Sequence, residues 1–220
     1  MKVMGDNREF LEMNGARPAL EVRFKFVDGS RRTFVQRDVQ AAENMWRHIN
    51  PFHLFSQGRI VVADDYSKSV FVCSQIGRID FLFIDSGFSA IPPDHADLVE
   101  LDEEEFFERV PIEEPARLER RNQERHVGDL LVSFLELRIA GGNTIYLMNE
   151  ALVKLPAENH TFMHRLLSKG AYCVRLREGG IGVLNLQNLI GYTVYPGMPE
   201  VPADSWMAEP QGFNSENESL

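Results

Sequence analysis

The residues with the clearest potential for chemistry are Asp85, Ser86 and Gly87, which follow the apolar pair Phe83-Ile84. An apolar strand that runs into Asp-Ser-Gly delivers a carboxylate into a tight turn. Two such carboxylates held close together share one proton, because neighbouring like charges cannot both ionise, and the pair then serves as general acid and base. Asp85 is expected to stand in such a turn, where it would take part in a pair of this kind only if a second carboxylate met it.

This stretch, Phe83-Ile84-Asp85-Ser86-Gly87, resembles the signature of aspartic proteases, and Leu189-Ile190-Gly191 is similar to the apolar element that supports the catalytic loop in that family. The resemblance implies that Asp85 is the catalytic carboxylate. Met198-Pro199-Glu200 stands where a second Asp-Ser/Thr-Gly belongs, so a catalytic pair requires a homodimer. The alternative is that Asp85-Ser86-Gly87 forms a turn at the end of a strand.

Other sets of residues for catalysis or metal binding are incomplete. His160 and His164 are four positions apart but have neither the glutamate of a metalloprotease helix nor a third ligand, which favours surface histidines. Cys73 and Cys173 lie in apolar runs and are expected to be buried free thiols. The chain has no Gly-x-Ser-x-Gly elbow and no phosphate loop. We expect no metal and no cofactor, and the residues favour a non-catalytic role.

Positive residues gather on the first predicted hairpin, and a nucleic-acid-binding role predicts that they cluster on one face. They are Arg23, Lys25, Arg31, Arg32 and Arg37. This cluster makes Arg23, Arg31 and Arg32 candidate binding residues. It also supports, as an alternative hypothesis, a small-barrel protein that binds nucleic acid. The formal net charge of −10 opposes that alternative, because binding to phosphates depends on clustered lysine and arginine.

A helix with one apolar face is predicted between Val39 and Phe55, and Pro51 should end or kink it. Trp46 and Phe52 lie on its apolar stripe. They are expected either to pack in the core or to form a surface for a protein partner. The sequence therefore adds Trp46 and Phe52 to the candidate binding residues.

The elements that position these residues follow a ββαββ order twice, in Leu20 to Phe81 and in Leu130 to Tyr195. Gly29 to Ile76 and Gly142 to Leu189 each span 47 positions. A shorter apolar stripe predicts the helix of the second copy: Phe162, Leu166 and Leu167. Duplication of one unit is therefore the working hypothesis.

The chain divides into five predicted segments. They are an N-terminal arm (1–18), a first ββαββ repeat (19–91), an acidic then basic helical connector (92–127), a second ββαββ repeat (128–197) and a flexible C-terminal tail (198–220). No window contains the roughly 20 apolar residues that a membrane span needs. The N-terminus has no apolar core of signal-peptide length, and a cytoplasmic location without membrane contact is expected.

The predicted fold class is α+β, with two tandem repeats that each form a small bent antiparallel sheet or barrel-like unit with one helix. The layout resembles small SH3-like or Sm-like barrels, and layout alone does not assign a function. The main functional hypothesis is a non-catalytic interaction or regulatory protein that binds a protein partner or a small ligand. Self-association as a homodimer is expected from leftover sheet edges. A hydrolase built on Asp85 and a nucleic-acid-binding protein are the alternatives.

Overall fold

The computed structural model of the chain describes residues 18–64, 66–83, 98–110, 130–152, 169–195 and 206. Strands dominate these residues, which also include two α-helices, so the expected α+β class is confirmed. Below, the first half is residues 18–83 and the second half is residues 130–195. Several predicted features lie outside the described residues: Asp85, His160, His164, the stripe of Phe162, Leu166 and Leu167, the arm up to residue 17, and the tail apart from Trp206.

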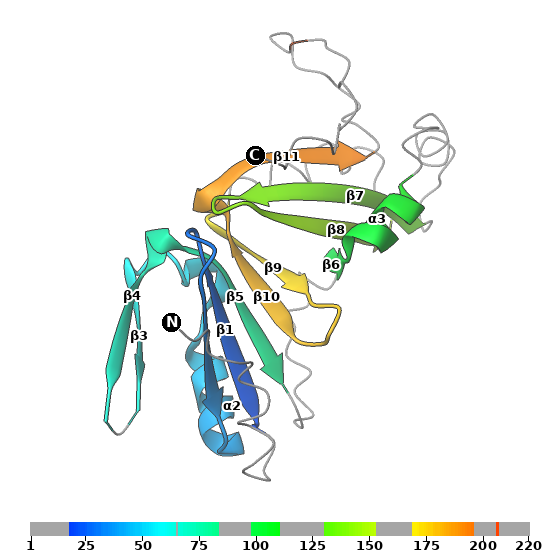
Figure 1. Cartoon of the computed structure of the whole chain (residues 1–220). Coiled ribbons are helices and arrows are strands. Elements are labelled where there is room, and N and C mark those ends of the chain that lie inside the picture. The colour runs from blue at the N-terminus through cyan, green and yellow to red at the C-terminus, as the bar shows by residue number, and fades with distance from the viewer. Residues whose placement is uncertain are drawn as a thin grey trace, which may run out of the picture.

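One nine-stranded sheet runs through both halves in the order β11-β7-β8-β6-β9-β10-β5-β1-β2 (Figure 1). Its strands are β1 (Leu20–Phe26), β2 (Arg31–Gln36), β5 (Ile76–Phe83), β6 (Leu98–Leu101), β7 (Leu130–Ile139), β8 (Asn143–Leu152), β9 (Ala171–Arg175), β10 (Ile181–Asn185) and β11 (Leu189–Tyr195). In the described part of the chain β11 and β2 end this sheet without meeting. The described strands therefore form no closed barrel, and one shared sheet replaces the two small bent sheets or barrel-like units that the sequence predicted.

The first half begins with the predicted hairpin of β1 and β2. Gly29 has φ of +81° in the turn, a conformation that glycine adopts without steric cost. Strand β1 pairs with β2 on one side and with β5 on the other. Helix α2 (Val39–His48) follows, and the Asp38 carboxylate caps it by accepting a hydrogen bond from the Ala41 amide. The helix ends before Pro51, as predicted.

A short 3₁₀ helix, η1 (Pro51–His53), leads from α2 to a separate two-stranded sheet. This sheet pairs β3 (Arg59–Ala63) with β4 (Lys68–Val72), and η2 (Cys73–Gln75) then connects to β5. One face of the hairpin packs on the core through Ile60, Val62 and Phe71. Figure 1 shows β4 at the outer margin of the first half.

The pairs β7–β8 and β7–β11 have the registers of β1–β2 and β1–β5 at an offset of 113 positions, whereas the β9–β10 register is shifted by one residue from that of β3–β4. Phe24 pairs with Ile79, and Leu137 pairs with Tyr192. The irregularity near the end of β1 also recurs at the corresponding place in β7. The backbone amides of Val27 and Ala140 bond to the carbonyls of Gln75 and Asn188 respectively, again 113 positions apart. Helix η5 (Leu186–Asn188) precedes β11 as η2 precedes β5.

The two halves join where β10 pairs antiparallel with β5. Strand β6 lies between β8 and β9, pairing antiparallel with β8 and in parallel with β9. Residues 98–101 therefore form a strand inside the sheet, where the sequence predicted a helical connector. The helical part of that region is α3 (Glu103–Arg109), and its basic continuation lies outside the described residues. Since β10 occupies the edge of β5, the first half cannot close on itself.

Three apolar cores stabilise this arrangement. The first contains Phe24, Trp46 and Phe81 of the first half and Val183 of the second half. The second core packs β7 and β8 against the other face of β9 and β10, with Leu82 contributed by β5. The third surrounds Phe106 of α3. Because two cores include residues of both halves, the described residues form one packed body.

Candidate functional site

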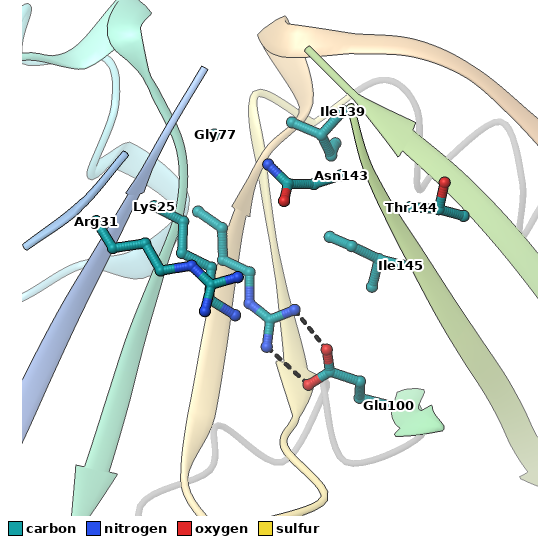
Figure 2. Close-up of a pocket in the computed structure, with 9 residues that line it drawn as sticks. Lys25, Arg31, Gly77, Glu100, Ile139, Asn143, Thr144 and Ile145 are labelled. Atoms are coloured by element: carbon teal, nitrogen blue, oxygen red, sulfur yellow. Dashed lines mark hydrogen bonds and ion pairs between the residues drawn. The ribbon is translucent and has the colours of Figure 1, made fainter. Parts of the chain in front are cut away.

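A cleft lies on the face of the sheet between the two halves (Figure 2). Its volume is about 160 Å³, enough for a few water molecules or a small ion. Strands β1, β2, β5, β6, β7 and β8 contribute its lining: Lys25, Arg31, Gly77, Arg78, Glu100, Ile139, Asn143, Thr144 and Ile145. The cleft therefore combines polar groups from segments that lie far apart in the sequence.

A network of buried charges forms the floor of the cleft. Asp80 is fully buried, and Arg78 is 5% exposed. The Arg78 guanidinium donates hydrogen bonds to Asp80 and to both carboxylate oxygens of Glu100, at 2.5 and 2.7 Å. Lys25 Nζ lies 2.9 Å from Asp80 Oδ2. That oxygen has this ion pair but no hydrogen bond of regular geometry.

The network keeps Arg78 charged although it is buried. Burial disfavours the guanidinium cation, but its hydrogen bonds to Glu100 and the charge of Asp80 outweigh this and raise the pKa of Arg78 above its ordinary value. The forked contact with Glu100 also fixes the orientation of both side chains. Since β5 carries Arg78 and β6 carries Glu100, the pair ties β6 to the junction of the halves.

Two cationic side chains and one amide side chain face each other across the mouth of the cleft. Figure 2 shows Arg31 and Lys25 reaching toward the centre from the first half, with Asn143 on the opposite side. Arg31 is exposed and makes no ion pair with another described residue. The lining supplies three cations against two carboxylates when Asp80 behind it is included. Chemically, the cleft could attract a small anion.

The predicted basic cluster is divided by the sheet. Arg31 lies opposite Lys25, on the face of the cleft, whereas Arg32 lies opposite Phe24, on the face of the first core. Arg23 pairs with Glu21 and with Glu178, each at 2.5 Å. The expectation that all five cations share one face is therefore wrong for Arg32, because neighbouring strand residues point to opposite faces. Arg37 follows the end of β2.

Trp46 and Phe52, the predicted partner surface, are largely covered. Trp46 is 7% exposed and packs against the rings of Phe81 and Phe83. Phe52 is partly buried, and Lys169 Nζ lies 5.0 Å from the centre of its ring. These aromatic residues connect α2 and η1 to the core and to the second half.

The remaining candidate groups lack the geometry of a reaction centre. Cys73 and Cys173 are buried free thiols, and burial raises the pKa of Cys173 to about 12, so the thiol stays protonated. His48 and His53 are exposed, and His48 Nδ1 contacts the Asn44 carbonyl at 2.6 Å. Across residues 18–64, 66–83, 98–110, 130–152 and 169–195, no three His, Cys, Asp or Glu side chains are grouped to hold a metal.

A second, more open cleft runs along α3. Its volume is about 650 Å³. Carboxylates and arginines line it together, including Glu104, Glu108 and Arg175. Asp102 pairs with Arg177, and Glu105 pairs with Arg109. Mutual pairing of this kind is typical of a solvated charged surface.

Two strand edges carry exposed apolar side chains that the sequence analysis did not single out. Val70 and Val72 of β4 are 57% and 54% exposed. Ile190 and Tyr192 of β11 are 70% and 37% exposed. Strand β11 contains no charged residue, whereas β2, at the other end of the same sheet, contains Arg31 and Arg32. Charged residues are a common protection of sheet edges, so β11 lacks a protection that β2 has.

Comparison of the chain with protein-family models, with curated proteins and with solved structures gives no match. None of the helices in the described residues has the length and apolar character to span a membrane. The geometry of the described residues is therefore the guide to function. The features of this geometry that best suit binding are the charged cleft and the two apolar strand edges.

Proposed function

We propose that this chain is a non-catalytic interaction protein that binds polypeptides through the open edges of β4 and β11. The observation that carries the proposal is the exposure of Val70, Val72, Ile190 and Tyr192 on strands that have one edge unpaired by any strand in the described ranges. An unpaired edge offers backbone donors and acceptors to an added strand, and neighbouring apolar side chains add affinity.

The charges of the cleft support a structural rather than a catalytic role for its floor. Asp80, the most buried carboxylate, is held by Arg78 and Lys25. A general acid or base must reach the proton that it transfers, and these contacts occupy Asp80 within the protein. These charges thereby hold β6 against β5 and leave binding to the exposed edges.

We infer that the halves are two copies of one unit, which consists of a ββαββ arrangement followed by one further strand, β5 in the first half and β11 in the second. The support is the shared register at an offset of 113 positions, which includes the irregularity near the ends of β1 and β7. Two segments of independent origin would not be expected to have the same strand irregularity at the same place. Duplication also accounts for the presence of a second set of edges, since each unit brings the same strands.

Selection from a displayed library of random peptides tests the proposed binding. We expect the selected peptides to alternate apolar and polar residues, as strand addition requires, and to bind Val70→Lys or Ile190→Lys about tenfold more weakly than wild type. Val35→Lys is the matched control, since Val35 is 38% exposed on the arginine-bearing edge β2. Selected peptides that bind all three variants like wild type would overturn the proposal, as would a selection without binders.

A second candidate function is the binding of a small anion in the cleft, favoured by the position of Arg31 at its mouth, across from Asn143. Titration with inorganic phosphate, followed by the amide resonances of Asn143 and Thr144, tests it. We expect saturable shifts that Arg31→Gln reduces about tenfold in affinity. Equal shifts in the wild type and Arg31→Gln, or none in the wild type, would reject this candidate.

A further inference from the structure

The junction of β10 with β5 shows how this chain covers a strand edge of its own. Val183 lies opposite Ile79, and Ile181 lies opposite Phe81, in antiparallel pairing. All five residues of β10 are buried, and so are all residues of β5 except Phe83. The fourth strand of the second half thus covers the last strand of the first half.

The strands that correspond to β10 and β5 in the other half have no neighbouring strand on the equivalent edge among the described residues. At the offset of 113 positions, β10 corresponds to β4 and β5 corresponds to β11. Val183 is 0% exposed, whereas its counterpart Val70 is 57% exposed. Ile79 is 1% exposed, whereas its counterpart Tyr192 is 37% exposed. Within the described residues β4 pairs only with β3, and β11 pairs only with β7.

We propose that β4 of one copy pairs antiparallel with β11 of a second copy, in the register of the internal junction. The inference rests on the proposed function, because it names the partner of the same edges. The register aligns Val70 with Tyr192, Ser69 with Thr193, and Phe71 with Gly191. The contact between copies then repeats the contact between the halves.

The residue types agree with this register. A β-branched residue opposite an aromatic residue, as in Val70 and Tyr192, is a favourable cross-strand pair, and serine opposite threonine allows a hydrogen bond. In the internal junction the corresponding pairs are Val183 with Ile79 and Gly182 with Asp80. Strand β11 contains no charged residue, and the one charged residue of β4 is Lys68 at its start, which the register aligns with Val194.

The proposed contact is head to tail, because it joins two different surfaces. Each copy has one β4 and one β11, so each copy both offers and receives a strand. Such contacts build a ring if the rotation between neighbours closes, and an open chain if it does not. In both cases the smallest repeating mass is that of one copy, 25.1 kDa.

Size-exclusion chromatography with light scattering at micromolar concentration is the first test. We expect the wild type to have a mass that is a multiple of 25.1 kDa. Val70→Lys alone and Tyr192→Glu alone should each reduce the assembly, with a dissociation constant at least tenfold higher. Val35→Lys on β2 should leave it unchanged, as the matched control. A monomeric wild type, or an assembly that either edge variant leaves intact, would overturn the proposal.

Mixing the two edge variants tests the head-to-tail geometry directly. Val70→Lys retains an intact β11, and Tyr192→Glu retains an intact β4. An equimolar mixture should therefore recover an assembly of at least twice 25.1 kDa, since the intact edges pair and the lysine and glutamate introduced at the other two edges carry opposite charges, although each variant alone does not assemble. A mixture that stays monomeric would contradict the proposed contact. A symmetric contact of β11 with β11 predicts instead that Val70→Lys assembles like wild type.

A cysteine pair makes the test independent of how the charged variants fold. The double variant Val70→Cys with Tyr192→Cys should form disulfides between copies on mild oxidation, and Val35→Cys with Tyr192→Cys should not. The absence of cross-linking in the first variant would reject the register. If the wild type is monomeric but its edges bind selected peptides, this inference fails and the proposed function stands; if the peptides also fail to bind, both fall.

Discussion

Hairpins β3–β4 and β9–β10 are alike in strand length and pairing but differ in what lies beside them. Every residue of β10 is buried, whereas alternate residues of β4 are exposed. Their own sequences do not account for the difference, because Lys68-Ser69-Val70-Phe71-Val72 is as rich in strand-forming residues as Ile181-Gly182-Val183-Leu184-Asn185. The contrast teaches that a neighbouring strand, β5, decides the burial of this hairpin.

The junction also contains features that the open edges lack. Asn185 donates hydrogen bonds to the carbonyls of Cys73 at 3.0 Å and Ile76 at 2.8 Å, whereas Val72 stands at the corresponding place of β4. Gly182 leaves room for Asp80, since a Cβ there would lie 3.0 Å from Asp80 Oδ1. The buried charges and the close backbone contacts are therefore specific to the covered edge. Four predictions test this contrast, in order of decreasing effect.

The largest effect is expected from Arg78→Leu, which removes the cation that holds Asp80 and Glu100. Loss of one partner of a buried ion pair should lower the free energy of unfolding by about 3–5 kcal/mol, because a buried charge remains uncompensated. Urea denaturation at neutral pH measures it. Arg47→Leu, which breaks the exposed pair with Glu43, is the control and should cost about 0.5 kcal/mol or less. A similar decrease in the free energy of unfolding in both variants would mean that the buried charges at the junction stabilise the fold no more than an exposed ion pair does.

Gly180→Ala should come next. Both Gly179 and Gly180 have φ of +91°, but a Cβ on Gly180 would overlap the carbonyl oxygen of Phe81, whereas a Cβ on Gly179 meets open space. The two alanine variants share the backbone cost, so their difference isolates the close approach of the β9–β10 turn to β5. We expect Gly180→Ala to be less stable than Gly179→Ala by about 1–3 kcal/mol in thermal or urea unfolding. Equal stabilities would show that the β9–β10 turn can move away from β5 without lowering the free energy of unfolding.

Asn185→Ala should destabilise the protein by about 1–3 kcal/mol, because the buried carbonyls of Cys73 and Ile76 lose a donor. The carbonyl of Ile76 keeps one hydrogen bond, from Asn188 at 2.9 Å. The equivalent change on the open hairpin, Val72→Ala, should cost about 0.5 kcal/mol or less, because Val72 is exposed. A larger loss for Val72→Ala in dilute, monomeric protein would reverse the comparison.

The smallest effect concerns pH. Burial raises the pKa of Cys173 to about 12 in the folded protein, above an unfolded value of about 8.5. Because the pKa of the thiol is higher in the folded state than in the unfolded state, burial of the neutral thiol contributes fully to the stability of the fold below the unfolded pKa. This contribution decreases as the pH rises toward the folded pKa of about 12. At pH 9.5 the wild type should therefore have lost about 1 kcal/mol relative to Cys173→Val, with neutral pH as the reference. Parallel stability curves for the two proteins between pH 7 and 10 would contradict this.

Much of the fold could be predicted from the sequence because it depends on neighbours in the chain. The hairpin at Asp28-Gly29, the start of α2 and its end before Pro51 follow from turn residues, apolar period and the geometry of proline. The equal spacing of Gly29 to Ile76 and Gly142 to Leu189 predicted two similar arrangements, and the strand registers agree with it. Burial of both cysteines was also predicted correctly.

The candidate site could be predicted only in part. Arg23 and Arg31 were recognised as a basic group, but Asp80 reads as one polar residue among apolar ones in Ile79-Asp80-Phe81. Nothing near Asp80 in the sequence shows that Lys25 of β1 will reach it, and nothing near Arg78 shows that Glu100 of β6 will. Strand β6 itself was predicted as part of a helical connector, because its acidic surroundings masked a run of only four residues. These contacts join segments too far apart for a local pattern to report.

The sequence by itself determined the strands other than β6, the helix α2, the turns and the alternation of side chains, since each depends on the conformational preferences of a few adjacent residues. Only the tertiary structure decided that β10 covers β5, that Glu100 of β6 meets Arg78, and that β4 and β11 each keep one edge unpaired by any described strand. The physical reason is that any strand edge carries the same backbone donors and acceptors. Which edges meet depends on the packing of the whole chain, and the ones left over determine where another polypeptide can bind.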